Sequence, residues 1–417
     1  MKHLIKINSS DFKINFDSTK FFGNLFIILS LLPWVSFGLN NLDSQPWAFI
    51  FAIIFFLAIK RIIFPKYSIK IIILVVLGLI FATSITSSID SSLIRALINY
   101  LSLPLLYVAF YNYFIRYGVP IKLFIVLNFV WIFFGFIELF FPEIMSLLSK
   151  MRTSPSRGVT SLAPEATFFG IYLFFSSLLF FELKNLINNN KIFILLVINF
   201  LAVLFLAKSS TVVLFYVISL FSFLMFKFFY TLRDLKILKK NIKNYIIWPI
   251  IFLTILILFK DSLSGTRLYS LSALLLEKSI MEIVIMDASI NSRVESFYFS
   301  QVGVYKNYFL PGGFDSFIEM RRQIFDTSET KYFLNRYESN KIMSWIGSIF
   351  YELGIFGIMI TAFLFKAIHY KSRGSIFYII TLFVILLSAV PVAFPLVPMV
   401  IALILYNNSY DHHKIYK

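Results

Sequence analysis

Long apolar runs that follow one another along the whole chain constrain its fold more than any other feature. A helix needs about 20 apolar residues to cross the hydrocarbon core of a bilayer. The runs are continuously apolar rather than alternating, and only helices or closed barrels satisfy every backbone polar group in lipid. The sequence therefore predicts an all-α polytopic membrane protein with about 12 transmembrane helices. The expected spans are residues 21–39, 44–60, 68–87, 95–115, 119–141, 166–183, 192–207, 209–229, 245–260, 343–366, 376–390 and 393–407.

The last two runs could also form one long helix broken by prolines. Pro391, Pro395 and Pro398 lie between or within residues 376–390 and 393–407. The whole stretch is too long for a single span, and a proline is tolerated in a turn far better than inside a helix. We therefore expect a hairpin of two helices, although the sequence leaves a single broken span open.

The composition fits a membrane protein and argues against a nucleic-acid-binding protein. The chain is 59% hydrophobic and 14% charged, whereas soluble proteins are about 25% charged. The net charge of +17 could indicate a nucleic-acid partner, but the lysines and arginines gather in short segments between apolar runs. That pattern is typical of cytoplasmic loops. We therefore expect the lipid bilayer as a partner and no nucleic acid.

The distribution of positive charge predicts the orientation. Lysines and arginines are dense in residues 60–70 and 227–243 and absent from the short turns 40–46 and 88–94. The positive-inside rule therefore places both termini in the cytoplasm and the two short turns outside. Residues 261–342 carry acids as well as bases, and long loops cross the membrane regardless of charge. We expect this long loop on the outer face.

Two segments predicted to lie outside are too long to be simple turns. Residues 142–165 and 261–342 exceed the length of about 15 residues beyond which loops are usually functional or disordered. The longer loop lies between the expected ninth and tenth spans, and its residues 268–286 have the apolar spacing of an interfacial helix. We expect residues 1–417 to form a single membrane domain that carries these two periplasmic loops.

Three ionisable residues lie close to the ends of expected spans. Arg95 begins the fourth span, Glu138 lies near the outer end of the fifth, and Lys208 lies in the short turn after the seventh. An ionisable group at membrane depth marks a functional site by default. The alternative is that each side chain reaches the lipid headgroups without a function. We favour function for Arg95, and both interpretations stay open for the other two.

The first outer loop carries two arginines and a glutamate. Arg152 and Arg157 precede Gly158, and Glu165 lies where the sixth span begins. Arginine suits bidentate recognition of phosphate, so the pair could bind phosphate while Glu165 accepts a proton. A glutamate at a helix N-terminus is also stabilised by the helix dipole without any function.

Three arginines of the long outer loop are further candidates. Arg293 is followed by aromatic residues and could contact phosphate or sugar. It could equally pair with an acid such as Glu295 on a solvated face, and the residues alone favour this ion pair. Arg321 and Arg322 follow a turn at residues 311–313 and are further candidates for substrate binding.

The sequence predicts no metal site and no cofactor. There is no cysteine, which excludes thiolate ligands and disulfides. An Asp-x-Asp pair and a P-loop are also missing, which argues against a nucleotide-sugar transferase and an ATPase. All the histidines lie in segments predicted to be cytoplasmic: His3, His369, His412 and His413.

Four segments carry a resemblance through their order and their predicted side of the membrane. They are RGVTSLAPEATFFGIYL (157–173), LAKSSTVVLFYVI (206–218), SRVESFYFSQVGVYKNYFLPGGFDSF (292–317) and ESNKIMSWIGSIFYELGIFGIMI (338–360). Together they resemble the O-antigen polymerase family, membrane enzymes that join lipid-linked repeat units. The last segment resembles the family's Glu-x-Gly-x-x-Gly, here Glu352, Gly354 and Gly357. Two positions depart from the family: Ala166 stands where a proline is usual, and Lys208 stands for an arginine.

The resemblance implies a fold, substrates and a location. It implies a GT-C-type glycosyltransferase fold with an outward cavity that residues 261–342 cap. It implies a metal-independent polymerase, in the bacterial inner membrane, that acts on undecaprenyl-pyrophosphate-linked oligosaccharides. A chain-length regulator membrane protein is a candidate partner. We expect catalysis by Glu165, Arg157 and Arg293, and substrate binding by Arg95, Arg152, Lys208, Arg321 and Arg322.

Two other functions remain as alternatives. The O-antigen ligase branch has a similar layout but places a histidine in the outer loop before the Glu-x-Gly-x-x-Gly helix, where this chain has Asn340 and Ser344. A flippase or secondary transporter would be expected to show repeat symmetry and charges at the membrane midplane. The sequence favours the polymerase over both.

Overall fold

The computed structural model describes residues 17–35, 45–86, 91–143, 158–231, 269–270, 274, 277–327, 333, 341–370 and 375–415. These residues are mainly helical and include no strand, which confirms the predicted all-α class. Five of the described helices are long and apolar enough to cross a membrane by length and composition. Together with shorter apolar helices, they indicate a multi-pass membrane protein. The five are Ser68–Ile85, Leu93–Tyr117, Ile121–Phe140, Asn189–Ala207 and Ser210–Phe228.

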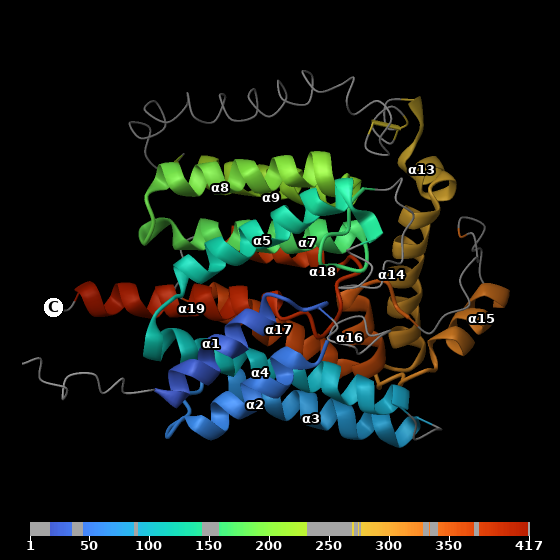
Figure 1. The fold of residues 1–417 in the computed structure, drawn as a ribbon. Helices are drawn as coiled ribbons and strands as arrows, with labels where there is room; N and C mark the ends of the chain where they lie inside the picture. Colours follow the sequence, from blue (N-terminus) through green and yellow to red (C-terminus); the bar gives the residue numbers. More distant parts are fainter. Residues whose placement is uncertain are drawn as a thin grey trace, which may run out of the picture.

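Most of the helices lie side by side in a bundle (Figure 1). Their bounds are α1 Ser18–Ser30, α2 Trp47–Ala58, α3 Ser68–Ile85, α4 Ser91–Tyr117, α5 Ile121–Phe140, α7 Ala166–Glu182, the 3₁₀ turn η2 Leu183–Asn185, α8 Asn189–Ala202, the π-helical turn η3 Val203–Ala207, α9 Ser210–Thr231, α13 Ile280–Met286, α14 Ala288–Lys306, α15 Phe317–Thr327, α16 Trp345–Leu353, α17 Ile355–His369, α18 Ser375–Leu386 and α19 Leu396–Ile415. In Figure 1, α8 and α9 lie at the top, α2 and α3 at the bottom, and α19 between them. The long α19 packs against α4 and α7, and α17 packs against α3.

Most expected spans coincide with a helix, and the differences have local causes. The run 343–366 is divided into α16 and α17 because Gly354 adopts φ 57° and ψ −135°, a conformation essentially restricted to glycine. Residues 376–407 form the two helices α18 and α19, as the expected hairpin requires, with Pro391 in the connection. The expected ninth span, 245–260, lies outside the described residues. Within the expected interfacial helix, 268–286, the structure has α13 from Ile280 to Met286, and Ser279 caps its start.

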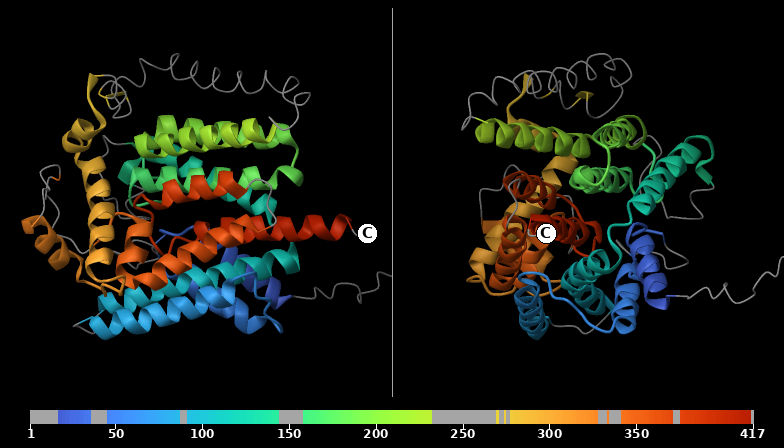
Figure 2. Two further views of the ribbon diagram at one scale, coloured as in Figure 1. Left: turned by 180° about the vertical axis from the view of Figure 1, so that it is seen from behind. Right: turned by 90° about the vertical axis from the view of Figure 1, so that its left-hand side faces the viewer.

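Helix α14 runs across the end of the bundle instead of along it (Figures 1 and 2). It packs against α16 and α15, so that the described part of the long loop covers this end of the bundle. The start of α1 and the end of α19 lie at the opposite end. The sides of the membrane that these two ends face stay a prediction from the charge pattern.

The surface and the interior of the bundle both suit a lipid environment. Large apolar side chains such as Ile73, Ile80 and Phe133 are exposed on α3 and α5, where lipid would cover them. Some of the buried polar side chains form hydrogen bonds with one another. The Asn128 amide donates to Asn199 Oδ1 at 2.8 Å, and the Asn199 amide donates to Ser177 Oγ at 3.1 Å. Such interhelical hydrogen bonds join helices where apolar burial gives no driving force.

Candidate functional site

A cavity of about 490 Å³ opens among segments that are far apart in the sequence. Gln45 and Phe49 line it from the start of α2, Arg95 from the start of α4, and Lys341 from the segment before α16. Residues 389–393, between α18 and α19, complete the wall. All four segments are ones that the charge pattern places on the outer face, so the cavity lies at the end of the bundle predicted to face outward.

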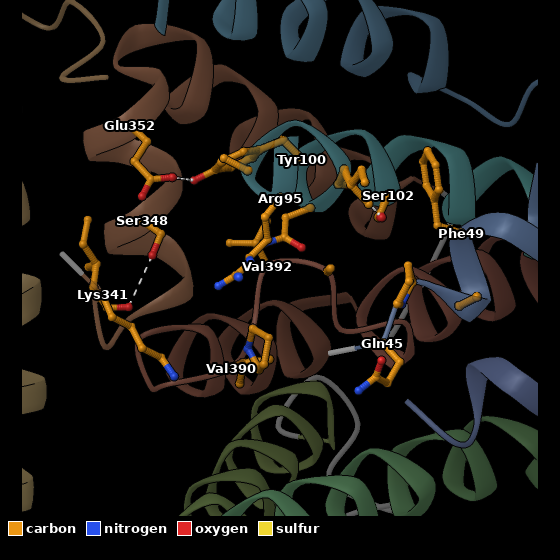
Figure 3. A pocket seen from close by; sticks show the side chains of 18 of the residues that line it. Gln45, Phe49, Arg95, Tyr100, Ser102, Lys341, Ser348, Glu352, Val390 and Val392 are labelled. Atoms are coloured by element: carbon orange, nitrogen blue, oxygen red, sulfur yellow. Dashed lines mark hydrogen bonds between the residues drawn. The ribbon is translucent and has the colours of Figure 1, made fainter. Parts of the chain in front are cut away.

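Four charged side chains line this cavity. Arg95 and Lys341 are exposed to it, and Figure 3 shows both side chains extending into the space. Asp315 is exposed and Glu352 is partly buried. In one cavity, two cations can bind a polyanion and two carboxylates can accept or donate a proton. A purely apolar pocket can do neither.

Glu352 is held by a tyrosine from another helix. The Tyr100 hydroxyl on α4 donates a hydrogen bond to Glu352 Oε2 at the end of α16 (Figure 3). The tyrosine is 2% exposed, so its hydroxyl is fixed by packing. The Glu-x-Gly-x-x-Gly motif has a physical basis here. Gly354 permits the sharp break after α16, and a Cβ at Gly357 would lie 2.0 Å from the carbonyl oxygen of Ile349.

The turn at residues 311–316 packs against the same helix end. The Gly312 N–H donates to the carbonyl oxygen of Tyr351 at 2.8 Å, and Ser316 Oγ lies 2.8 Å from the Tyr351 hydroxyl. Asp315, in this turn, has φ 60°, a left-handed conformation that aspartate tolerates better than most residues. Two of the four segments that carried the family resemblance therefore meet, and each contributes a carboxylate to the cavity: Asp315 from one and Glu352 from the other.

Glu138 proves to be an anchor for the first outer loop. Its carboxylate accepts from the backbone N–H of Thr160 at 2.8 and 2.9 Å and from that of Ser161 at 2.5 Å. Residues 159–163 are buried beside η3. A Cβ at Gly158, whose φ is 106°, would lie 2.4 Å from the carbonyl oxygen of Ala207. These contacts give Glu138 a structural role, which is neither of the two interpretations that the sequence left open.

Of the other sequence candidates in the first loop, the structure describes only Glu165. Glu165 is partly buried and precedes α7, and its carbonyl oxygen accepts from the N–H of Phe168. Phe168 lines the cavity, but Glu165 is not among its lining residues. Arg152 and Arg157 lie outside the described residues.

Arg293 and Lys208 both lie beside the start of α9. The Arg293 guanidinium on α14 donates to Thr211 Oγ1 in the first turn of α9. Lys208, three residues before Thr211, is exposed and adopts φ 48° in the tight turn between η3 and α9. The structure therefore brings these two candidates to the same helix start, away from the residues that line the main cavity.

Arg321 forms a buried ion pair with Glu295, the acid that the sequence suggests as a partner for Arg293. Its Nη2 lies 2.6 Å from Glu295 Oε1, and the two side chains are 8% and 4% exposed. Burial raises the pKa of Glu295, although the Arg321 charge beside it lowers it. The pair lines a smaller cavity of about 190 Å³ that shares Lys341 with the main cavity. Arg322 is exposed on the same helix.

The main cavity gathers one residue that the sequence predicted as a binding residue, Arg95, with several that it did not. Lys341, Asp315 and Tyr100 carried no signal of their own, because each lies in a different segment and none belongs to a recognisable spacing. Glu352 was visible through the Glu-x-Gly-x-x-Gly resemblance, but its chemical role was not. No group of three or more metal-ligating side chains occurs within the described ranges.

Comparison with known proteins finds no family model, no curated protein and no solved structure that matches this chain. The class that the fold itself supports is a multi-pass helical membrane protein with a charged cavity at one end of the bundle.

Proposed function

We propose that the protein is a metal-independent glycosyltransferase that polymerises oligosaccharide repeat units carried on undecaprenyl pyrophosphate. The reaction would take place on the periplasmic face of a bacterial inner membrane. The observation that supports this function best is the cavity in which Arg95 and Lys341 converge with Glu352. Much of its wall comes from segments that the charge pattern places outside. Phe168, Asp315 and Glu352 line it from three of the segments that resemble O-antigen polymerases.

The chemistry needs what this cavity offers. A hydroxyl of one repeat unit attacks the anomeric carbon of the growing chain, and undecaprenyl pyrophosphate leaves with the bonding electrons. Cations that are already in place stabilise the charge that develops on such a leaving group. Arg95 can bind two phosphate oxygens at once, and Lys341 adds a point charge. A diphosphate leaving group is already activated, so the reaction itself requires neither a nucleotide nor a metal.

The remaining cations are proposed to bind the lipid-linked substrate around the cavity. Arg293 and Lys208 lie together at the start of α9, and Arg152 and Arg157 belong to the segment that precedes the buried residues 159–163. Glu165 stays a candidate acid or base, although Glu352 has the stronger position because it lines the cavity. A chain-length regulator in the same membrane remains a proposed partner.

The position of a histidine favours a polymerase over a ligase. His369 ends α17, and its Nδ1 lies 2.8 Å from Ser375 Oγ at the start of α18. The cavity is lined by the segment just before α16 and by its last turns, at the opposite end of this helix pair. This histidine therefore cannot serve at the outer site as a ligase histidine would.

The glycan profile of a deletion strain tests the proposed function against its alternatives. Loss of a polymerase leaves a single repeat unit on the lipid A core, and this is the expected result. Loss of a ligase leaves bare core and accumulates polymer on the lipid carrier. Loss of a flippase traps lipid-linked units on the cytoplasmic face. Either of the last two profiles, or an unchanged polymer ladder, contradicts the proposal.

A further inference from the structure

We propose that Glu352 is the general base that accepts the proton of the attacking sugar hydroxyl, and that Tyr100 positions it. This inference rests on the proposed glycosyltransferase function and assigns a catalytic residue within the same cavity. It replaces Glu165 as the first candidate for this role.

The arrangement of the Glu352 carboxylate leaves one oxygen available to a substrate. Oε2 accepts the hydrogen bond from Tyr100, which fixes the plane of the carboxylate. Oε1 has no hydrogen-bond partner in the part of the chain that the structure describes, and Glu352 lines the cavity. A general base must come within hydrogen-bond reach of the proton that it removes, and this oxygen can do so.

Two other glutamates at helix ends show what a structural carboxylate looks like in this bundle. Glu138 accepts backbone N–H groups on both oxygens. Glu182 accepts from the Tyr378 hydroxyl on Oε2 and from the Asn407 amide, at 3.2 Å, on Oε1. Both oxygens of each carboxylate are therefore engaged within the protein, and neither residue lines the main cavity. Glu352 differs, because among the described residues its only hydrogen-bond partner is Tyr100 and its side chain lines the cavity.

A purely structural role explains Glu352 poorly. Placing a carboxylate where it has one hydrogen bond is costly, and a well-packed apolar pair would join α4 to α16 at least as well. An ionisable group at membrane depth is costly to bury, so it marks a functional site by default.

The proposed step balances without any further reactant. The acceptor O–H bond breaks, and its proton moves to Glu352 Oε1. The acceptor oxygen forms a bond to the anomeric carbon, and the bond from that carbon to the pyrophosphate oxygen breaks. The electron pair leaves with undecaprenyl pyrophosphate. Arg95 and Lys341, in the same cavity, stabilise the negative charge that develops on it. The carboxyl then releases its proton to water before the next cycle.

The test is steady-state kinetics of the purified full-length protein, in lipid nanodiscs, with undecaprenyl-pyrophosphate-linked repeat units. The variants are Glu352→Gln, Tyr100→Phe and, as a matched control, Glu319→Gln, which changes an exposed glutamate of α15. Removing a general base typically costs a factor of about 10²–10⁴ in rate. We expect Glu352→Gln to lower kcat at least about a hundredfold with little change in KM, and to abolish the acid limb of the pH–rate profile. The control should match the wild type.

Tyr100→Phe separates positioning from packing. It keeps the carboxylate but removes its hydrogen-bond donor, so the ionised form is less favoured. The acid limb should therefore move to higher pH, with a loss of about tenfold in kcat, roughly the value of one hydrogen bond to a charged group. A merely structural contact would lower the amount of folded protein without moving this limb. If Glu352→Gln fails to reach the membrane, the pH–rate profile of Tyr100→Phe tests the role of Glu352 instead.

The outcomes distinguish the inference from the function on which it rests. A wild-type protein that is folded but forms no polymer contradicts both. A wild-type protein that polymerises, with a Glu352→Gln variant that retains kcat and the acid limb, overturns only the assignment of the base. An unmoved acid limb in Tyr100→Phe overturns the positioning role.

Discussion

The carboxylate of Glu138 and the backbone of Thr160 are joined by hydrogen bonds that fasten the first outer loop to α5. The Thr160 N–H lies 2.8 and 2.9 Å from the two carboxylate oxygens, and its hydroxyl lies 3.2 Å from each. Ser161 extends the same connection by donating its hydroxyl to the carbonyl oxygen of Trp131 at 2.6 Å. The segment that leads from the loop to α7 is thus held against the bundle before α7 begins.

This connection predicts a loss of stability when Glu138 is replaced. Glu138→Ala leaves buried N–H groups without an acceptor, and each such loss costs about 1–3 kcal/mol. We expect a clear fall in the thermal midpoint of the detergent-solubilised protein, and a smaller fall for Glu138→Gln, whose amide oxygen can still accept. The exposed Glu143 offers a control in Glu143→Gln, which should leave the midpoint unchanged. Equal midpoints for wild type and Glu138→Ala would refute the anchoring role.

Arg293 is predicted to contribute more to activity than to stability. Loss of a charged hydrogen bond to substrate costs roughly 1.5–3 kcal/mol, which is about tenfold to over a hundredfold in rate. If Arg293 only joins α14 to α9 through its hydrogen bond to Thr211, its loss should lower stability and leave the activity of the folded protein unchanged. We therefore expect Arg293→Ala to reduce polymer formation by at least about tenfold at normal protein levels. Arg293→Lys should restore part of it if only charge matters, and little if the planar fork matters.

The same measurement on Arg157→Ala, with protein levels checked in the membrane, extends the test to the first loop. Polymer at the wild-type level from both alanine variants would remove Arg157 and Arg293 from the site. Lys208 and Arg95 would then remain as the sequence candidates on this face.

The ion pair between Arg321 and Glu295 is predicted to be structural. Removing one partner of a buried pair leaves an uncompensated charge and typically costs about 3–5 kcal/mol, whereas apolar replacement of both is often neutral. We expect Arg321→Met and Glu295→Leu each to lower the thermal midpoint, and the double variant to recover most of the loss. If the single variants keep the wild-type midpoint but lose substrate affinity, Arg321 binds substrate as the sequence had suggested.

Chelation is predicted to leave activity unchanged. No histidine or cysteine is expected on the outer face, and the described residues contain no cluster with the ligands that Zn²⁺ or Ca²⁺ requires. Polymer synthesis by the purified protein should therefore be the same with and without EDTA. Loss of synthesis in EDTA that a divalent ion restores would show that the reaction needs a metal.

The helical class and most of the helix positions could be predicted from sequence because lipid allows few solutions. A continuous apolar run must be a helix there, and α3, α5 and α9 fall close to their expected bounds. The break at Gly354 could not be predicted from apolarity, since the runs on its two sides are equally apolar. It depends on a backbone conformation that only the packed structure reveals.

The residues of the site were harder to predict from the sequence than the helices, because their roles depend on their surroundings in the folded protein. Glu138 and Glu352 look alike in sequence, as single acids within expected spans. What separates them is whether the carboxylate is enclosed by backbone donors, as at Thr160, or open to a cavity beside Tyr100. Lys341 lines the same cavity as Arg95 and Glu352 although these residues lie far apart in the sequence, and no local spacing encodes that proximity.

Polymerisation by purified protein in nanodiscs, from undecaprenyl-pyrophosphate-linked repeat units alone, tests the central claim most directly. The wild type and Lys306→Gln, which changes an exposed lysine of α14, should form a ladder of polymers. Arg95→Gln and Lys341→Gln should each lower the rate by about tenfold or more, since each removes a charged contact to the leaving pyrophosphate. Absence of polymer from folded wild-type protein, or full activity of both Arg95→Gln and Lys341→Gln, would contradict the account.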